Sequence, residues 1–195
     1  VKEAVEAEVQ YEVKMEWDAR GTALVGSLLF TAGSGLVSHL TLAHPSAGVA
    51  DPVLALEAMD GSWQFDRCDV IVSQGRKGIA AGANSKASLT RCSVRGCGNA
   101  NGQDPLTSGH ARCALQVFDT AKIEISSSKM GASRQAVTAF DEASASFVDC
   151  HVHLPPDSFA VALNDSCRVT LKEVHISLAS IHPLKEQGDV ESDDG

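Results

Sequence analysis

Residues 61–75 read GSWQFDRCDVIVSQG, and the spacing of the apolar and small residues in this stretch recurs along the chain. These residues occupy a starting position s and the positions s+2, s+5 and s+7. Five copies begin at residues 63, 87, 123, 145 and 169. They are Trp63-Phe65-Cys68-Val70, Ala87-Leu89-Cys92-Val94, Ile123-Ile125-Ser128-Met130, Ala145-Phe147-Cys150-Val152 and Val169-Leu171-Val174-Ile176. A weaker copy, Gly35-Val37-Leu40-Leu42, precedes them.

A second short alternating run lies about eight residues before most of these starts. The runs are Leu54/Leu56, Ile79/Ala81, Leu115/Val117, Val137/Ala139 and Val161/Leu163. Alternation with a period of two is typical of short β-strands, so each repeat contains about three strands. Repeats of this length bury their apolar faces only against their neighbours. The sequence therefore predicts an all-β fold, a single-stranded parallel β-helix of about five to seven rungs, and the crossover rule makes it right-handed.

Two further segments, SLTRCSVRGC (88–97) and SASFVDCHVHL (144–154), carry a family resemblance together with the opening stretch. They resemble the right-handed parallel β-helix repeats of the pectate-lyase-like superfamily. The resemblance is closest to the intracellular carbohydrate-binding/sugar-hydrolase-type repeats of β-helix F-box proteins, and it covers roughly residues 22–180. Such repeats occur in lyases, hydrolases, ubiquitin-ligase receptors and scaffold proteins, so the resemblance implies a fold and leaves the activity open.

The chain has 195 residues, a length suited to one domain. We expect residues 1–20 to form an N-terminal cap or first irregular rung, residues 21–180 the β-helix, and residues 181–195 an acidic tail or linker. A Gly- and Asn-rich insertion near residues 98–110 explains the one long interval between repeats. The net charge of −9 argues against nucleic acid or an anionic membrane surface as a partner. No apolar run is long enough to predict a membrane span.

Three of the six cysteines, Cys68, Cys92 and Cys150, share position s+5. Apolar or small residues hold the same position in other repeats, so we interpret this column as buried thiols and predict no metal site there. Cys97 and Cys113 flank the insertion, and a disulfide between them is the alternative to two free thiols. Unpaired cysteines favour an intracellular or organellar location, although the compartment stays open.

Equivalent positions on stacked rungs lie about 4.8 Å apart, so the register predicts which polar side chains are neighbours. His151 and His175 should be adjacent, but no third ligand converges on them, and we interpret them as part of a solvated polar face. Asp119, Asp141 and Asp165 form another column. Turn formation is its ordinary interpretation, and a weak calcium site is the alternative. We expect neither a metal nor a cofactor.

The strand before each start corresponds to the face on which pectate-lyase-like enzymes carry their catalytic carboxylates. Its expected outward positions contain no Asp, Glu, Lys or Arg: Gly78, Ala80 and Gly82; Ala114, Gln116 and Phe118; Ala136, Thr138 and Phe140; Ala160, Ala162 and Asn164. Glycoside hydrolysis needs two positioned carboxylates, and a lyase needs a base. We therefore predict no catalytic residues, and the residues argue against an enzyme.

This face is instead expected to be flat and apolar, which is typical of a protein interface. We predict that its partner-binding residues are Phe118, Phe140, Gln116, Thr138 and Asn164. The predicted function is a non-catalytic protein-interaction or scaffold module, as an accessory subunit or recognition domain of a larger assembly with one or more protein partners. The alternative is a carbohydrate-binding module or a degenerate polysaccharide lyase or hydrolase, in which the two phenylalanines stack on sugar rings.

Overall fold

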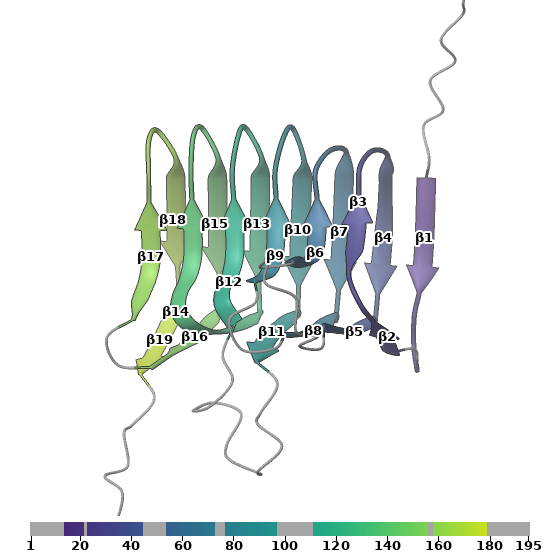
Figure 1. Ribbon diagram of the computed structural model, residues 1–195, viewed down its shortest axis with the longest axis horizontal. Helices are drawn as coiled ribbons and strands as arrows, with labels where there is room; N and C mark the ends of the chain where they lie inside the picture. Colours follow the sequence, from purple (N-terminus) through teal and green to yellow (C-terminus); the bar gives the residue numbers. More distant parts are fainter. Residues whose placement is uncertain are drawn as a thin grey trace, which may run out of the picture.

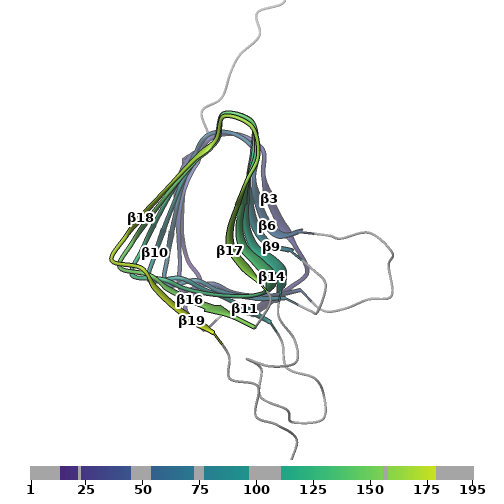
Figure 2. The same cartoon turned by 90° about the vertical axis from the view of Figure 1, so that its left-hand side faces the viewer.

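The computed structural model describes residues 14–21, 23–44, 54–72, 77–96, 111–155 and 158–178. These residues form nineteen β-strands and no helix. The strands wind around one axis and stack into three parallel sheets, which we call sheets A, B and C (Figure 1). Seen along that axis, the sheets form the three sides of a roughly triangular coil (Figure 2). The predicted parallel β-helix is therefore confirmed.

The chain passes through the sheets in the order A, B, C and then returns to A. Sheet A contains β1 (Lys14–Asp18), β4 (Ser34–Ser38), β7 (Ser62–Asp66), β10 (Lys86–Thr90), β13 (Lys122–Ser126), β15 (Ser144–Val148) and β18 (Arg168–Lys172). Sheet B contains β2 (Ala23–Val25), β5 (Thr41–His44), β8 (Asp69–Val72), β11 (Ser93–Gly96), the first part of β14 (Lys129–Ala139), β16 (His151–Leu154) and β19 (His175–Leu178). Sheet C contains β3 (Leu28–Phe30), β6 (Leu54–Ala58), β9 (Lys77–Ala81), β12 (Ala111–Val117), the second part of β14 and β17 (Phe159–Leu163).

The strand register matches the repeat in the sequence. Trp63 pairs with Gly35 on one side and Ala87 on the other, and the same column continues through Ile123, Ala145 and Val169. The long interval between repeats leaves the register of sheet A intact, because β10 still pairs with β13 along its whole length. In sheet C, β12 pairs with both β9 and β14, with one register shift between Ala111 and Cys113. The predicted insertion, near residues 98–110, lies outside the described residues.

The core is a column of side chains that point into the coil from all three sheets. Its largest fully buried members include Phe147, Leu89, Ile125 and Met130. Near the N-terminal end the ring centroids of Phe30 and Trp63 are 4.5 Å apart, a distance typical of packed aromatic pairs. Burial of apolar surface between successive rungs is thus the main source of stability, as expected for a solenoid.

Two corners of the coil require a left-handed backbone. Ten non-glycine residues have φ between 48° and 63°: His39, Arg67, Arg91, Ser127, Asp149 and Glu173 between sheets A and B, and Ala83, Asp119, Asp141 and Asp165 between sheets C and A. The first corner is also held by backbone bonds between rungs, such as that from the His39 N–H to the Asp66 carbonyl at 2.9 Å. No β-branched residue appears among these ten, consistent with its high cost in this conformation.

The prediction that Gly78, Ala114, Ala136 and Ala160 of sheet C face outward is wrong. A Cβ built on Gly78 would lie 2.5 Å from Cγ1 of the buried Val94, so this position faces the interior. Ala114 and Ala136, which share the column, are fully buried in the core, and Ala160 packs against it. The strands bend here so that two successive residues face inward, which strict alternation does not anticipate.

Ser85 is an exception within the core. It shares a column with Ala121 and Ala143, all three side chains are fully buried, and the Ser85 hydroxyl has no hydrogen-bond partner among the described residues. A buried hydroxyl without a partner costs about 1–3 kcal/mol. We expect Ser85→Ala to raise the free energy of unfolding by about 1 kcal/mol in urea titrations, with Ser88→Ala on the outer face as the control. A lower stability for Ser85→Ala would contradict this account.

The predicted N-terminal strand pattern is present as β1, whose Met15 and Trp17 are half-buried against the core. Residues 1–13 and 179–195 lie outside the described residues, so the cap and tail boundaries stay predictions. No helix long and apolar enough to cross a membrane occurs in the described part of the chain.

Candidate functional site

The five predicted partner-binding residues lie along sheet C and the corner that follows it. Thr138 is only 7% exposed, and its hydroxyl donates a hydrogen bond to Oε1 of Gln135 at 3.0 Å. Gln116 is half-buried on the neighbouring strand. This part of the face therefore offers little open surface. The role of these residues in partner binding stays a prediction.

Phe118, Phe140 and Asn164 sit one above another at the corner after sheet C. Each backbone N–H donates a 3.0 Å hydrogen bond to a carbonyl of the preceding rung, from Ala81, Val117 and Ala139 respectively. The Phe118 ring lies directly against Gly82, where any Cβ would overlap it. Both rings are half-buried, whereas Asn164 is exposed. The structure thus brings the three residues into one column, as the sequence predicts, but Phe118 is already packed on its own chain.

The predicted aspartate column forms a hydrogen-bonded ladder. Oδ2 of Asp119 accepts the Ala83 N–H at 2.9 Å, and Oδ2 of Asp141 accepts the Asp119 N–H at 3.1 Å. Each carboxylate thereby binds the turn of the preceding rung. Asp tolerates the left-handed conformation found here, so the turn-forming interpretation accounts for the column.

His151 and His175 are neighbours as predicted, with ring centroids 5.5 Å apart. Nδ1 of His153 lies 2.6 Å from Oγ of Ser177. Burial, aided by the nearby His151, lowers the pKa of His153 below its ordinary value. Within the described residues, no three His, Cys, Asp or Glu side chains come together in a way that could hold a metal ion.

The thiols at position s+5 point inward and bond to backbone carbonyls at the corner. Sγ of Cys92 lies 3.4 Å from the Phe65 carbonyl oxygen of the preceding rung, and Sγ of Cys150 lies 3.6 Å from the Ile125 carbonyl oxygen of its own preceding rung. Burial raises the pKa of the Cys150 and Cys113 thiols, so both remain protonated donors at neutral pH. Cys113 is a free thiol here, while Cys97, its predicted alternative partner, lies outside the described residues.

An ion-pair network at the corner between sheets A and B was missed by sequence reasoning. Arg91 pairs with Asp66 of the preceding rung at 2.7 Å, and Arg67 contacts both Asp66 and His39. His39 in turn contacts Asp18, whose pKa is lowered to about 2, chiefly by its bond to Arg20. The repeat register could have predicted this network, because an Asp at position s+3 of one repeat lies next to an Arg at position s+4 of the following repeat. The acidic and basic side chains of this corner therefore pair with one another along the stack of rungs.

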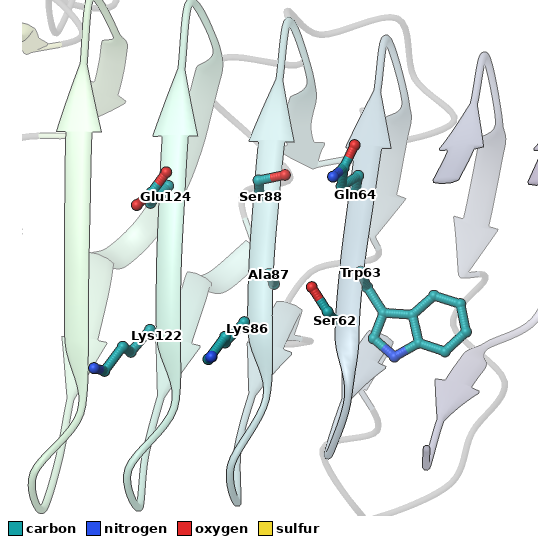
Figure 3. Close-up of a pocket in the computed structure, with 8 residues that line it drawn as sticks. All are labelled: Ser62, Trp63, Gln64, Lys86, Ala87, Ser88, Lys122 and Glu124. Atoms are coloured by element: carbon teal, nitrogen blue, oxygen red, sulfur yellow. The ribbon is translucent and has the colours of Figure 1, made fainter. Parts of the chain in front are cut away.

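Sheet A carries a shallow polar hollow of about 280 Å³ across β7, β10 and β13 (Figure 3). Lys86 and Lys122 are partners in the register of adjacent strands, and their side chains lie on the same side of the sheet. The other lining residues are Ser62, Trp63, Gln64, Ala87, Ser88 and Glu124. Trp63 is only 3% exposed, so its ring is not available to stack on a ligand. This hollow was not singled out from the sequence, because alternation does not show which outward face is concave.

The C-terminal end of the solenoid exposes its core positions. Leu171 and Ile176 are 45% and 44% exposed, although Phe147 and Val152, at the same positions one rung earlier, are buried. In the described structure β18 pairs only with β15, and β19 only with β16. Among the residues that the structure describes, none pairs with the outer edges of β18 and β19, and these edges lie beside exposed apolar side chains.

No protein-family model, curated protein or solved structure matched this chain.

Proposed function

We propose that this chain is a non-catalytic interaction module, a rigid β-solenoid that holds a binding surface in fixed geometry within a larger assembly. The observation that carries this proposal is the exposure of Leu171 and Ile176, which occupy core positions in the last described rung. Contiguous exposed apolar surface typically marks a protein interface. Open strand edges bind other chains through backbone hydrogen bonds.

The state of the polar side chains supports a non-catalytic role. The Asp119 carboxylate accepts a backbone N–H, and the carboxylates of Asp66 and Asp69 pair with arginines of the following rung. Hydrolysis of a glycoside requires two carboxylates placed on either side of a substrate. The carboxylates named here serve the stacking of the rungs instead. The resemblance to β-helix F-box proteins supports one form of the proposal, a recognition domain for protein partners.

The test compares two candidate surfaces in a quantitative native pull-down from the source cells. The end variant is Leu171→Asp/Ile176→Asp, and the face variant is Phe118→Asp/Phe140→Asp. Val148→Asp is the matched control, because Val148 is exposed on the neighbouring strand β15 but points away from the core. We expect the wild type, the control and the face variant to retain stoichiometric partners, and the end variant to lose them at least about tenfold, since a charge opposes burial of this apolar end.

Thermal unfolding of each variant checks that the coil remains folded before the recoveries are compared. Loss of partners in the face variant, with retention in the end variant, would place the interface at the five predicted residues instead of at the last rung. Absence of any stoichiometric partner from the wild-type recovery would reject the interaction module itself.

The polar hollow of sheet A supports a second candidate function, carbohydrate binding. Sugar hydroxyls require several directed donors and acceptors, and Gln64, Ser88 and Glu124 supply them on one surface. A glycan array separates the two functions. Retention of a glycan by the wild type and its loss in Lys86→Ala/Lys122→Ala would support this candidate, whereas an array without binding would reject it.

A further inference from the structure

We propose that the partner at the last rung is a second copy of this chain, stacked head to tail so that its first rung continues the solenoid. This inference rests on the proposed function, because it names the occupant of the same apolar end. The first and last rungs lie at opposite ends of the long axis (Figure 1), so the same contact can recur from copy to copy. In the described structure β1 pairs only with β4 and β2 only with β5, so no described residue pairs with the outer edges of these two strands either.

The apolar positions of the two ends match. Extending the register of sheet A by one step places Val169 against Met15 of the next copy, and Leu171 against Trp17. The same extension of sheet B places Ile176 against Leu24. Met15, Trp17 and Leu24 are half-buried where they stand and already pack against the core. Stacking would therefore bury apolar side chains from both copies in one continuous core.

The charged positions also match at the outer end of the sheet A strand. Lys172 falls opposite Asp18 of the next copy in the extended register. Asp18 is an exposed carboxylate held by Arg20 and His39, and its pKa of about 2 keeps it ionised at neutral pH. The next residue along, Glu173, falls beside Ala19, which precedes Arg20. Lys172 thus faces a carboxylate at one end of the joined strands, while the same register places Arg168 opposite Lys14 at the other end, so the Lys172–Asp18 pair is the attractive charged contact that can be tested.

The backbone bonds needed at the junction are those already repeated inside the coil. At each internal corner the N–H at s+4 donates to the next rung, as Asp149 does to Lys172 at 3.0 Å. The N–H at s+6 donates to the preceding rung, as His175 does to Cys150 at 2.8 Å. Across the junction the same pattern pairs the Glu173 N–H with the Asp18 carbonyl, and the Ala23 N–H with the Val174 carbonyl. The junction lies in sheets A and B, because the last described strand of sheet C, β17, belongs to the rung before.

A head-to-tail contact joins two different surfaces, so it leaves one free end of each kind and predicts linear chains of copies. Sedimentation velocity of the full chain over a concentration series tests this. We expect the weight-average mass of the wild type to rise beyond that of a dimer with increasing concentration. Leu171→Asp, blocked at the last rung, and Trp17→Asp, blocked at the first rung, should each stay monomeric, while Val148→Asp should behave as the wild type.

Mixing the two blocked variants distinguishes this arrangement from a two-fold dimer. Each variant keeps one intact end, so an equimolar mixture should form a 1:1 complex that grows no further. If Trp17→Asp disturbs the first rung, the charge pair gives a second route. Lys172→Asp and Asp18→Lys should each weaken association at least about tenfold, and the double variant Lys172→Asp/Asp18→Lys should recover it.

A wild type that is monomeric at every concentration, or that stops at a dimer, would overturn the head-to-tail proposal. If the end variant still loses a different stoichiometric partner in the pull-down, the interaction module stands and only the identity of its partner falls. If no partner is recovered in either experiment, both proposals fail.

Discussion

Replacing Phe147 with alanine is expected to lower the free energy of unfolding by about 3–5 kcal/mol, the range for removing a buried aromatic ring. Phe147 is the fourth of the five residues of β15 and is fully buried. In the strand register Phe147 lies between Ile125 of the preceding rung and Leu171 of the following rung. A rung contacts only its two neighbours, so the cavity cannot be filled by residues farther along the coil.

Urea unfolding followed by circular dichroism measures this loss, with Val148→Ala as the control. Val148 is the next residue on the same strand but is exposed, and its truncation should change stability by no more than about 0.5 kcal/mol. Equal effects at the two positions would contradict the assignment of inward and outward faces. An additional early transition in Phe147→Ala would show that the C-terminal rungs unfold separately from the rest.

Replacing Gly61 with alanine is expected to cost about 2–4 kcal/mol through two effects that act together, backbone strain and overlap. Gly61 has φ of +85°, a conformation that side chains other than glycine adopt at a cost of about 1–2 kcal/mol. A Cβ there would also overlap the Gly33 carbonyl oxygen and lie 2.9 Å from the Gly33 nitrogen. This neighbour is backbone of the preceding rung, which accepts the Ser62 N–H at 2.9 Å and has little freedom to move.

Gly21→Ala separates the two effects. Gly21 has a similar φ of +75°, but nothing lies within 4 Å of the position a Cβ would take. We expect this variant to lose only the conformational part, about 1 kcal/mol. Thermal unfolding of the two variants measures the difference. Similar losses at Gly61 and Gly21 would mean that the rungs can separate to admit a methyl group.

The fold could be predicted from the sequence because comparing the repeats with one another shows which residues occupy equivalent positions. Trp63, Ala87, Ile123, Ala145 and Val169 stand at the same position in successive copies, and the register pairs them in that order. Strict alternation did not predict the bend of sheet C. At Gly78 two successive residues face inward, and a small residue there is equally compatible with an outward position.

The candidate sites were less accessible to sequence reasoning, for a different physical reason. The register placed His151 beside His175 and stacked Asp119 on Asp141, since columns follow from the repeat. The repeat does not, however, predict how exposed each side chain is. Leu171 has the same position as the buried Phe147, and only its place in the last described rung leaves it open. The concavity around Lys86 likewise depends on the shape of the sheet and not on the pattern of residues.

The strand β14 runs from sheet B into sheet C over Lys129–Ala139 without a break. At the same corner, other rungs accommodate residues 73–76 or residues 97–110 between strands, and Cys113 still pairs with Lys77 and Gln135. The connection here can therefore differ in length while the flanking strands keep their pairing, with one register shift between Ala111 and Cys113 after the longest connection. Closing a longer loop adds only a small entropic cost, so a foreign peptide or a whole folded domain grafted between Val72 and Lys77 should leave the coil intact. Peptides or domains grafted at this corner of successive rungs would therefore be held at a regular spacing, set by the distance of about 4.8 Å between neighbouring strands.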